Sequence, residues 1–149
     1  MVVTAETANE ALAHRWHMDI FDAGKLEVAE EILGPGFVFH MPGQDIQGAE
    51  EVKQLAAAMR AAFPDLRITH EDALAAGNQV VIRWTARGTH RGTYLPPWEV
   101  PPTGREIRMR GIDWYQVVDG KIAEAWIEID ELGMLQQMGA VQEPGQPRE

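Results

Sequence analysis

The sequence predicts an α+β domain in which a curved antiparallel sheet wraps around N-terminal helices and forms a cone with an internal pocket. Three observations predict this class. Helical periodicity dominates the first part of the chain, long strand-like runs follow it, and hairpin turns join those runs. Helices followed by consecutive strands favour an antiparallel sheet over a parallel one, and a curved sheet closed by helices leaves a small-molecule pocket.

The first part of the chain carries apolar residues at helical spacing in several segments. We expect helices over residues 4–21, 26–32 and 50–62, with a short strand at 37–40 between the last two. Gly24 ends the first helix, and the run Gly34-Pro35-Gly36 ends the second.

Long strands dominate the second part. We expect them over residues 66–74, 79–90, 106–118 and 121–130, followed by a short helix over 132–138. Gly77-Asn78 marks one turn, and Asp119-Gly120 is the strongest two-residue hairpin signal in the chain.

Composition sets the class of molecule. The 149 residues are 45% hydrophobic and 24% charged, which predicts one globular domain over residues 1–141, with a disordered tail over 142–149. No apolar run is long enough to cross a bilayer, no signal peptide is evident, and cysteine is absent, so we expect a cytoplasmic protein. The formal net charge is −10 and only three lysines are present, which disfavours nucleic acid and membranes as partners.

The Asp119-Gly120 turn allows a prediction of strand register. With a two-residue loop, Asp113 lies opposite Trp126 and Met109 lies opposite Asp130. One face of this hairpin then mixes carboxylates with aromatic rings, and the other face is apolar. The mixed face contains these residues: Met109, Asp113, Tyr115, Val117, Ile122, Glu124, Trp126, Glu128 and Asp130.

Two interpretations of the mixed face remain open. Its carboxylates either meet solvent while the apolar face forms the core, or line the pocket while the apolar face packs against another sheet or subunit. Tyr115 and Trp126 favour the pocket, because large rings are seldom fully exposed. A carboxyl group enclosed by rings is desolvated and can hold or deliver a proton near neutral pH.

Other residues have a structural and a functional interpretation. His90 and His40 end strands and are either hydrogen-bonded core residues or pocket residues. His14 and His17 have a spacing that could chelate a metal, but no third ligand is evident, so we expect no metal site. The proline-rich segment 94–104 carries Trp98 and is either a connector or the rim of the pocket.

Several motifs occur in the order found in one family. They are FPDL (63–66), GTH-x-G (88–92), PPTG (101–104), DGKI-x-E-x-W-x-x-x-D (119–130) and QxG (137–139). The chain therefore resembles the SnoaL-like polyketide cyclases. The resemblance implies a nuclear-transport-factor-like (cystatin-like) fold, as in ketosteroid isomerase, and dimers or higher oligomers formed through the sheet. It also implies that Asp130 is the acid/base of an intramolecular aldol condensation.

The leading hypothesis is a cofactor-independent lyase or isomerase that cyclises a polyketide-like carbonyl compound, in which Asp130 and Asp113 are catalytic. The residues expected to bind substrate are His40, His90, Trp98, Tyr115, Trp126 and Glu128. One alternative is hydrolysis of an epoxide or lactone between the two aspartates, assisted by Arg108 or Arg110; another is a binding protein without catalysis. The expected partners are a small-molecule substrate and further copies of the chain, as a homodimer or homotetramer.

Overall fold

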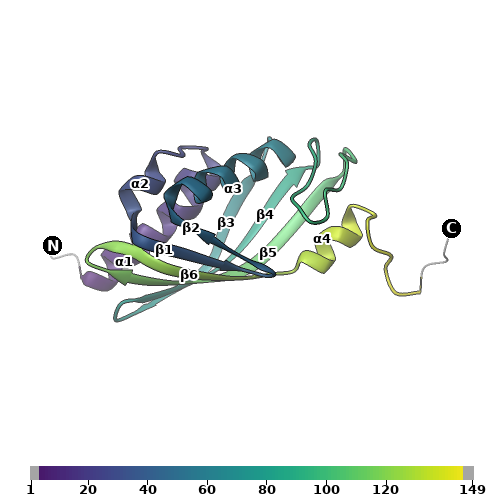
Figure 1. Cartoon of the computed structure of the whole chain (residues 1–149). Helices are drawn as coiled ribbons and strands as arrows, with labels where there is room; N and C mark the ends of the chain where they lie inside the picture. Colours follow the sequence, from purple (N-terminus) through teal and green to yellow (C-terminus); the bar gives the residue numbers. More distant parts are fainter. Residues whose placement is uncertain (1–3, 146–149) are drawn as a thin grey trace.

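A computed structural model describes residues 4–145 and shows an α+β fold with a curved, unclosed sheet (Figure 1). The helices are α1 (Ala5–Arg15), the π-helical η1 (Trp16–Asp22), α2 (Val28–Ile32), α3 (Gly48–Ala62) and α4 (Glu131–Gln137). The strands are β1 (Leu33–Met41), β2 (Gln44–Gln47), β3 (Arg67–Ala76), β4 (Gln79–Thr89), β5 (Glu106–Val118) and β6 (Lys121–Ile129). The predicted fold class is confirmed.

The sheet has the order β2-β1-β6-β5-β4-β3, and its pairs are antiparallel except β1 with β6. The sequence prediction lacks β2, because a strand of four residues with mostly polar side chains has no detectable alternation. Gly34-Pro35-Gly36, predicted to end a helix, lies within β1 beside an irregularity in its pairing with β6.

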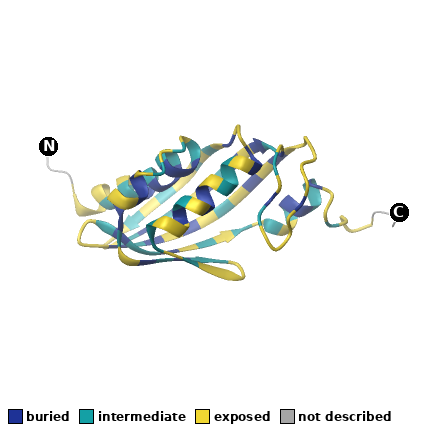
Figure 2. Cartoon of the chain, turned by 45° about the horizontal axis from the view of Figure 1, so that its top comes forward, coloured by how far each residue is buried: buried dark blue, intermediate teal, exposed yellow. Residues whose placement is uncertain are grey.

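The helices α1, η1, α2 and α3 lie together on one side of the sheet (Figure 1). Coloured by exposure, α3 alternates between buried and exposed positions along its length (Figure 2). Its buried residues Val52, Leu55 and Ala56 join the core, which also contains Trp16, Phe37 and Phe63. Burial of these apolar side chains is the main force that holds the helices on the sheet.

The predicted first helix changes its hydrogen-bonding pattern at Trp16. Thr4 caps its start, since the Thr4 side chain accepts a hydrogen bond from the Thr7 backbone N–H. From Trp16 onward the helix is π-helical, and the Ala23 N–H donates to the Met18 carbonyl five residues earlier. Trp16, His17, Ile20 and Phe21 are all buried in this segment. Sequence periodicity predicts the helix but not its wider final turns.

The predicted register of the β5–β6 hairpin holds at the turn and then fails. Val118 pairs with Lys121 and Val117 with Ile122, but Gln116 pairs with Glu124, so Ala123 is an extra residue in β6. Such a bulge reverses the face of every later side chain in its strand. Asp113 therefore lies opposite Ile127, and its predicted pairing with Trp126 is wrong.

None of the helices formed by residues 4–145 is both long and apolar enough to span a membrane. Residues 142–145 form neither helix nor strand, and the remaining four residues of the tail expected to be disordered, 146–149, lie outside the described residues.

Candidate active site

A cavity of about 610 Å³ lies between the helices and the sheet. Its wall is mainly apolar and combines residues of η1, α3 and the central strands, such as Phe21, Phe39, Leu55, Trp84, Met109 and Ile127. The segment 94–98 supplies the rim, where the Tyr94 hydroxyl and the Trp98 indole N–H both donate to Glu131, at 2.9 and 3.0 Å. A cavity of this size and polarity suits a small, largely hydrophobic ligand.

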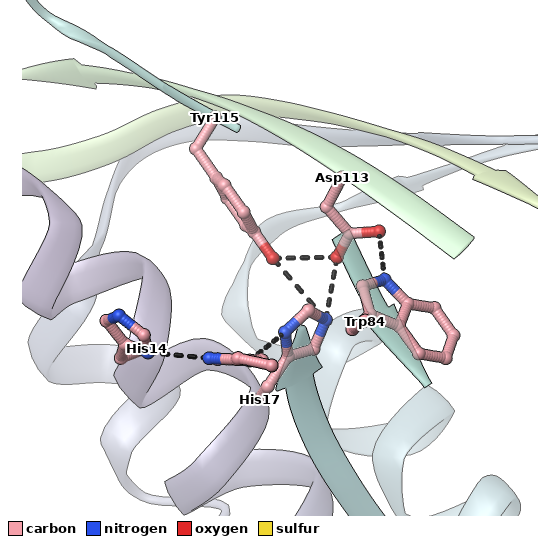
Figure 3. Close-up of polar contacts among 6 residues, drawn as sticks. His14, His17, Trp84, Asp113 and Tyr115 are labelled. Carbon is pink, nitrogen blue, oxygen red and sulfur yellow. Dashed lines mark hydrogen bonds and ion pairs between the residues drawn. The ribbon is translucent and has the colours of Figure 1, made fainter. Parts of the chain in front are cut away.

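Asp113 of β5 is a fully buried acidic residue in the wall of this cavity. Trp84 Nε1 donates to Asp113 Oδ1 at 2.9 Å, and the Tyr115 hydroxyl donates to Oδ2 at 2.7 Å (Figure 3). His17 Nε2 lies 2.7 Å from the same Oδ2. A carboxylate offers about four acceptor positions, two on each oxygen, so these three contacts leave one position on Oδ1 unused.

Tyr115 supports this carboxylate from outside the cavity wall. Burial raises the pKa of Tyr115 well above its ordinary value, and the neighbouring Asp113 raises it further. The hydroxyl therefore stays protonated and remains a donor to Asp113 over the physiological pH range. Trp84, which cannot lose its indole proton in water, donates to the other oxygen.

His17 links Asp113 to the helical layer. It lies in η1, is only 5% exposed at its side chain, and packs against Trp84 with ring centroids 5.4 Å apart. Its second nitrogen, Nδ1, lies 2.7 Å from Nε2 of His70 on β3. His70 Nδ1 in turn lies 2.6 Å from Nδ1 of His14 on α1. Burial lowers the pKa of His70 to about 4, and the other two rings contribute to that shift.

Asp130 does not line the cavity, contrary to its predicted position on the same face as Asp113. It is the N-cap of α4, where Oδ1 accepts from the Gly133 N–H at 3.0 Å, and its side chain is 45% exposed. Its Oδ2 lies 3.8 Å from Arg110, an exposed ion pair. The bulge at Ala123 and the end of β6 at Ile129 account for this placement.

Trp126 and Glu128 lie on the opposite face of the sheet from Asp113, again because of the bulge. They border a shallow outer hollow together with Ile112 and Trp114. The prediction that they share the face of Asp113 is therefore wrong.

The two predicted pocket histidines also lie outside the cavity wall. His40 stacks on Trp126 with ring centroids 5.3 Å apart, and its hydrogen bond with Glu124 raises its pKa. His90 is buried and contacts the Thr103 hydroxyl at 3.0 Å, which ties the end of β4 to the proline-rich segment. Of the predicted substrate-binding residues, Trp98 lines the rim and Tyr115 contacts Asp113.

Most residues of the site carry no recognisable signal in the sequence. The spacing of His14 and His17 suggests only a metal-binding pair, and no motif indicates a role for His70, Trp84 or Glu131. In the structure both of those histidines contact His70, at separations typical of hydrogen bonds. Across residues 4–145, no group of three or more His, Asp or Glu side chains is arranged to hold a metal ion. One signal in the sequence could have indicated a role for His17: it is a polar residue next to Trp16 in a predicted helix whose apolar face is buried.

A buried carboxylate with three polar contacts lies in the wall of an apolar cavity between the helices and a curved sheet, an arrangement suited to a small-molecule ligand. The SnoaL-like polyketide cyclase family matches the chain over residues 11–138. The chain belongs to that family, as its motifs predicted. No curated protein sequence matches the chain significantly.

Solved structures share the fold over nearly the whole chain. A SnoaL-like polyketide cyclase candidate from Jannaschia sp. CCS1 is 25% identical, with 95% of this chain and 99% of that chain covered and a TM-score of 0.79. IdmH from Streptomyces antibioticus, a polyketide cyclase candidate, is 30% identical over 88% of this chain and 98% of that one, with a TM-score of 0.72. AclR from Streptomyces galilaeus, a hydroxylase candidate, is 24% identical over 97% and 87%, with a TM-score of 0.80, and shows the fold alone.

Proposed function

We propose that the protein is a cofactor-independent enzyme that catalyses an aldol-type cyclisation, or a related isomerisation, of a small hydrophobic carbonyl compound resembling a polyketide. The observation that carries this proposal is the buried Asp113 carboxylate, held by three donors and facing an apolar cavity. Family membership and the polyketide cyclase candidates of the same fold support the reaction class.

In the proposed reaction Asp113 Oδ1 takes the proton from a carbon that lies between two carbonyl groups. The resulting enolate carbon attacks a third, more distant carbonyl of the same molecule, one C–C bond forms as the C=O π bond breaks, and the new alkoxide takes the proton back from Asp113. Protons and electrons balance without a metal or redox cofactor. The apolar wall excludes water and holds the flexible substrate in a folded pose, which supplies the orientation that cyclisation needs.

The hydrolase alternative requires Asp113 and Asp130 to flank one water molecule near Arg108 or Arg110. Asp130 instead caps α4 and pairs with Arg110 outside the cavity. Arg108 and Arg110 are both exposed and alternate along β5 with the buried Met109. No observation favours this alternative.

The proposal is tested by exchange of an acidic C–H bond. A 1,3-diketone deuterated at its central carbon should lose deuterium to water faster with the protein than in buffer at the same pH, as followed by NMR. The variant Ala86→Phe, which fills the cavity from β4, should abolish the acceleration and weaken binding of the diketone. Saturable binding without acceleration would support the binding-protein alternative, and neither binding nor acceleration would contradict the proposed substrate class.

We further propose that the protein forms a homodimer through the outer face of the sheet. Ile112, Trp114 and Trp126 are 48%, 49% and 38% exposed there and border one apolar hollow. Contiguous exposed apolar residues of this kind are typical of protein interfaces. The chemistry of the cavity does not depend on this association, because the cavity lies between the sheet and the helices, on the other face of the sheet.

Sedimentation velocity should show a dimer for the wild-type chain and a monomer for Trp114→Arg. Leu132→Arg changes another exposed apolar residue, on α4, and should leave the dimer intact. A monomeric wild-type chain at micromolar concentration would contradict this interface.

A further inference from the structure

A continuous line of hydrogen-bond contacts runs from the buried carboxylate to Glu10 on the surface, and Figure 3 shows the part from Asp113 to His14. Its links are Asp113 to His17 at 2.7 Å, His17 to His70 at 2.7 Å, His70 to His14 at 2.6 Å, and His14 to Glu10 at 3.3 Å. Exposure of the side chain rises along the line, from 0% at Asp113 and 5% at His17 to 40% at His14 and 37% at Glu10. The line therefore runs between the sheet and the helices α1 and η1, from the cavity wall to solvent.

The ends of this line fix where protons must sit. Asp113 and Glu10 are carboxylates and act as acceptors, so His17 Nε2 and His14 Nε2 must each carry a proton. The three rings between them use both nitrogens in contacts. The two contacts with the carboxylates and the two contacts between rings each need one N–H proton, which makes four. Three neutral imidazoles carry only three such protons, so the line is fully hydrogen-bonded only if the three rings together hold one proton more.

Three arrangements satisfy every contact with that extra proton, and the one that places the charge on His70 is disfavoured because burial lowers the pKa of that ring to about 4. Two arrangements remain. In the first, His14 is the cation, and His70 donates from Nε2 to His17 Nδ1. In the second, His17 is the cation beside Asp113, and His70 donates from Nδ1 to His14 Nδ1. His70 is neutral in both arrangements and differs only in which nitrogen carries its proton.

We propose that His14, His70 and His17 form a proton relay that carries one excess proton between the surface and the Asp113 carboxylate. Inward transfer breaks the N–H bond at His14 Nδ1 and forms one at His70 Nδ1. It also breaks the N–H bond at His70 Nε2 and forms one at His17 Nδ1. The positive charge moves from His14 to His17, the number of protons is unchanged, and the reverse steps carry the charge outward.

The surroundings of His70 keep its imidazole ring neutral, as the proposed relay requires. Desolvation and the two neighbouring histidines lower the pKa of His70 to about 4, so this ring stays uncharged near neutral pH. The titratable groups that face the three rings are Glu10 from α1 and Asp113 and Tyr115 from β5. Trp84 of β4 packs against His17 and adds no charge.

The relay allows His17 to gain or lose a proton without water entering the apolar cavity. It thereby sets the charge beside Asp113 before each cycle and deepens the proposed acid/base function, on which its role in turnover rests. His70 and His14 are positioning residues, because they act through His17 and Asp113.

The first test needs no substrate and uses the full chain labelled with ¹⁵N at histidine. If the rings share one excess proton, the ¹⁵N shifts of His14 and His17 should titrate with one common midpoint, because coupled sites release a proton as a unit. His70 should remain neutral through that transition. Independent midpoints for His14 and His17, or a His70 cation at neutral pH, would overturn the relay.

Two variants sharpen this test. His70→Phe should separate the midpoints of His14 and His17, whereas His40→Phe, which removes a histidine on the outer face, should leave them equal. His70 is only partly buried, so its replacement should leave the fold intact, as checked by circular dichroism. Coincident midpoints that persist in His70→Phe would also overturn the relay.

The second test measures deuterium exchange of the 1,3-diketone. His70→Ala should slow exchange about 10-fold or more, a fraction of what a positioned proton-transfer group supplies, and added imidazole should restore much of the loss. A purely structural role of His70 predicts no rescue by imidazole. If the wild-type chain catalyses exchange and His70→Ala matches it in all buffers, the relay fails and the proposed function stands. If the wild-type chain shows no exchange, the proposed function fails and the titrations alone decide the relay.

Discussion

Replacing Asp113 by asparagine is expected to slow protein-catalysed exchange of the 1,3-diketone by about 10²–10⁴-fold, the contribution of a positioned general base. Asparagine has nearly the same size and keeps one oxygen acceptor, but its amide cannot take a proton from carbon. Affinity for the diketone should change little, because the cavity wall is mainly apolar. Exchange followed by NMR and binding followed by calorimetry separate these two effects.

The matched control is Asp130→Asn, the same chemical change at the other predicted catalytic aspartate. Asn caps helix N-termini about as well as Asp, so α4 should keep its start and exchange should keep its rate. The opposite result, loss of exchange in Asp130→Asn with an active Asp113→Asn, would restore the role that the family resemblance implies for Asp130.

The second large effect concerns stability. His17→Phe should lower the free energy of unfolding by about 3–5 kcal/mol, because it leaves the fully buried Asp113 carboxylate without its histidine partner. The phenyl ring is similar in size to imidazole and can pack against Trp84 and Tyr115 as His17 does, so the loss arises from the unpaired charge rather than from a cavity. Chemical denaturation monitored by tryptophan fluorescence measures the difference.

A double variant and a surface variant test this explanation. His17→Phe/Asp113→Leu should recover part of the lost stability, since it removes the buried charge together with its partner but leaves the Trp84 N–H and the Tyr115 hydroxyl without their acceptor. His40→Phe removes a half-exposed histidine that contacts Glu124 and Asp45, and it should change stability by less than about 1 kcal/mol. Equal losses in the single and double variants would show that packing, not charge, explains the effect.

Local patterns in the sequence were sufficient to predict most of the helices and strands. Apolar spacing located α3 within two residues, and β5 was predicted with its observed bounds. The two-residue turn at Asp119-Gly120 paired Val118 with Lys121 as predicted. The family motifs led to the correct family.

The residues of the candidate site could be predicted only in part from the same patterns. Asp113 and Tyr115 precede the bulge and lie on the predicted face, whereas Trp126, Glu128 and Asp130 follow it and were placed wrongly. One extra residue in β6 changes every later position in the strand, and alternation of residue types cannot reveal it when both faces carry apolar side chains. The contacts of His17 with His70, 53 residues apart, depend on packing of η1 against β3.

By itself, the sequence determined the α+β class, the family and the presence of a carboxylate among aromatic residues on β5, because these follow from composition, periodicity and local motifs. Only the tertiary structure decided which aspartate faces the cavity and which histidines reach it. Those facts depend on a single bulge and on the approach of elements distant in the chain, and neither leaves a local pattern in the residues.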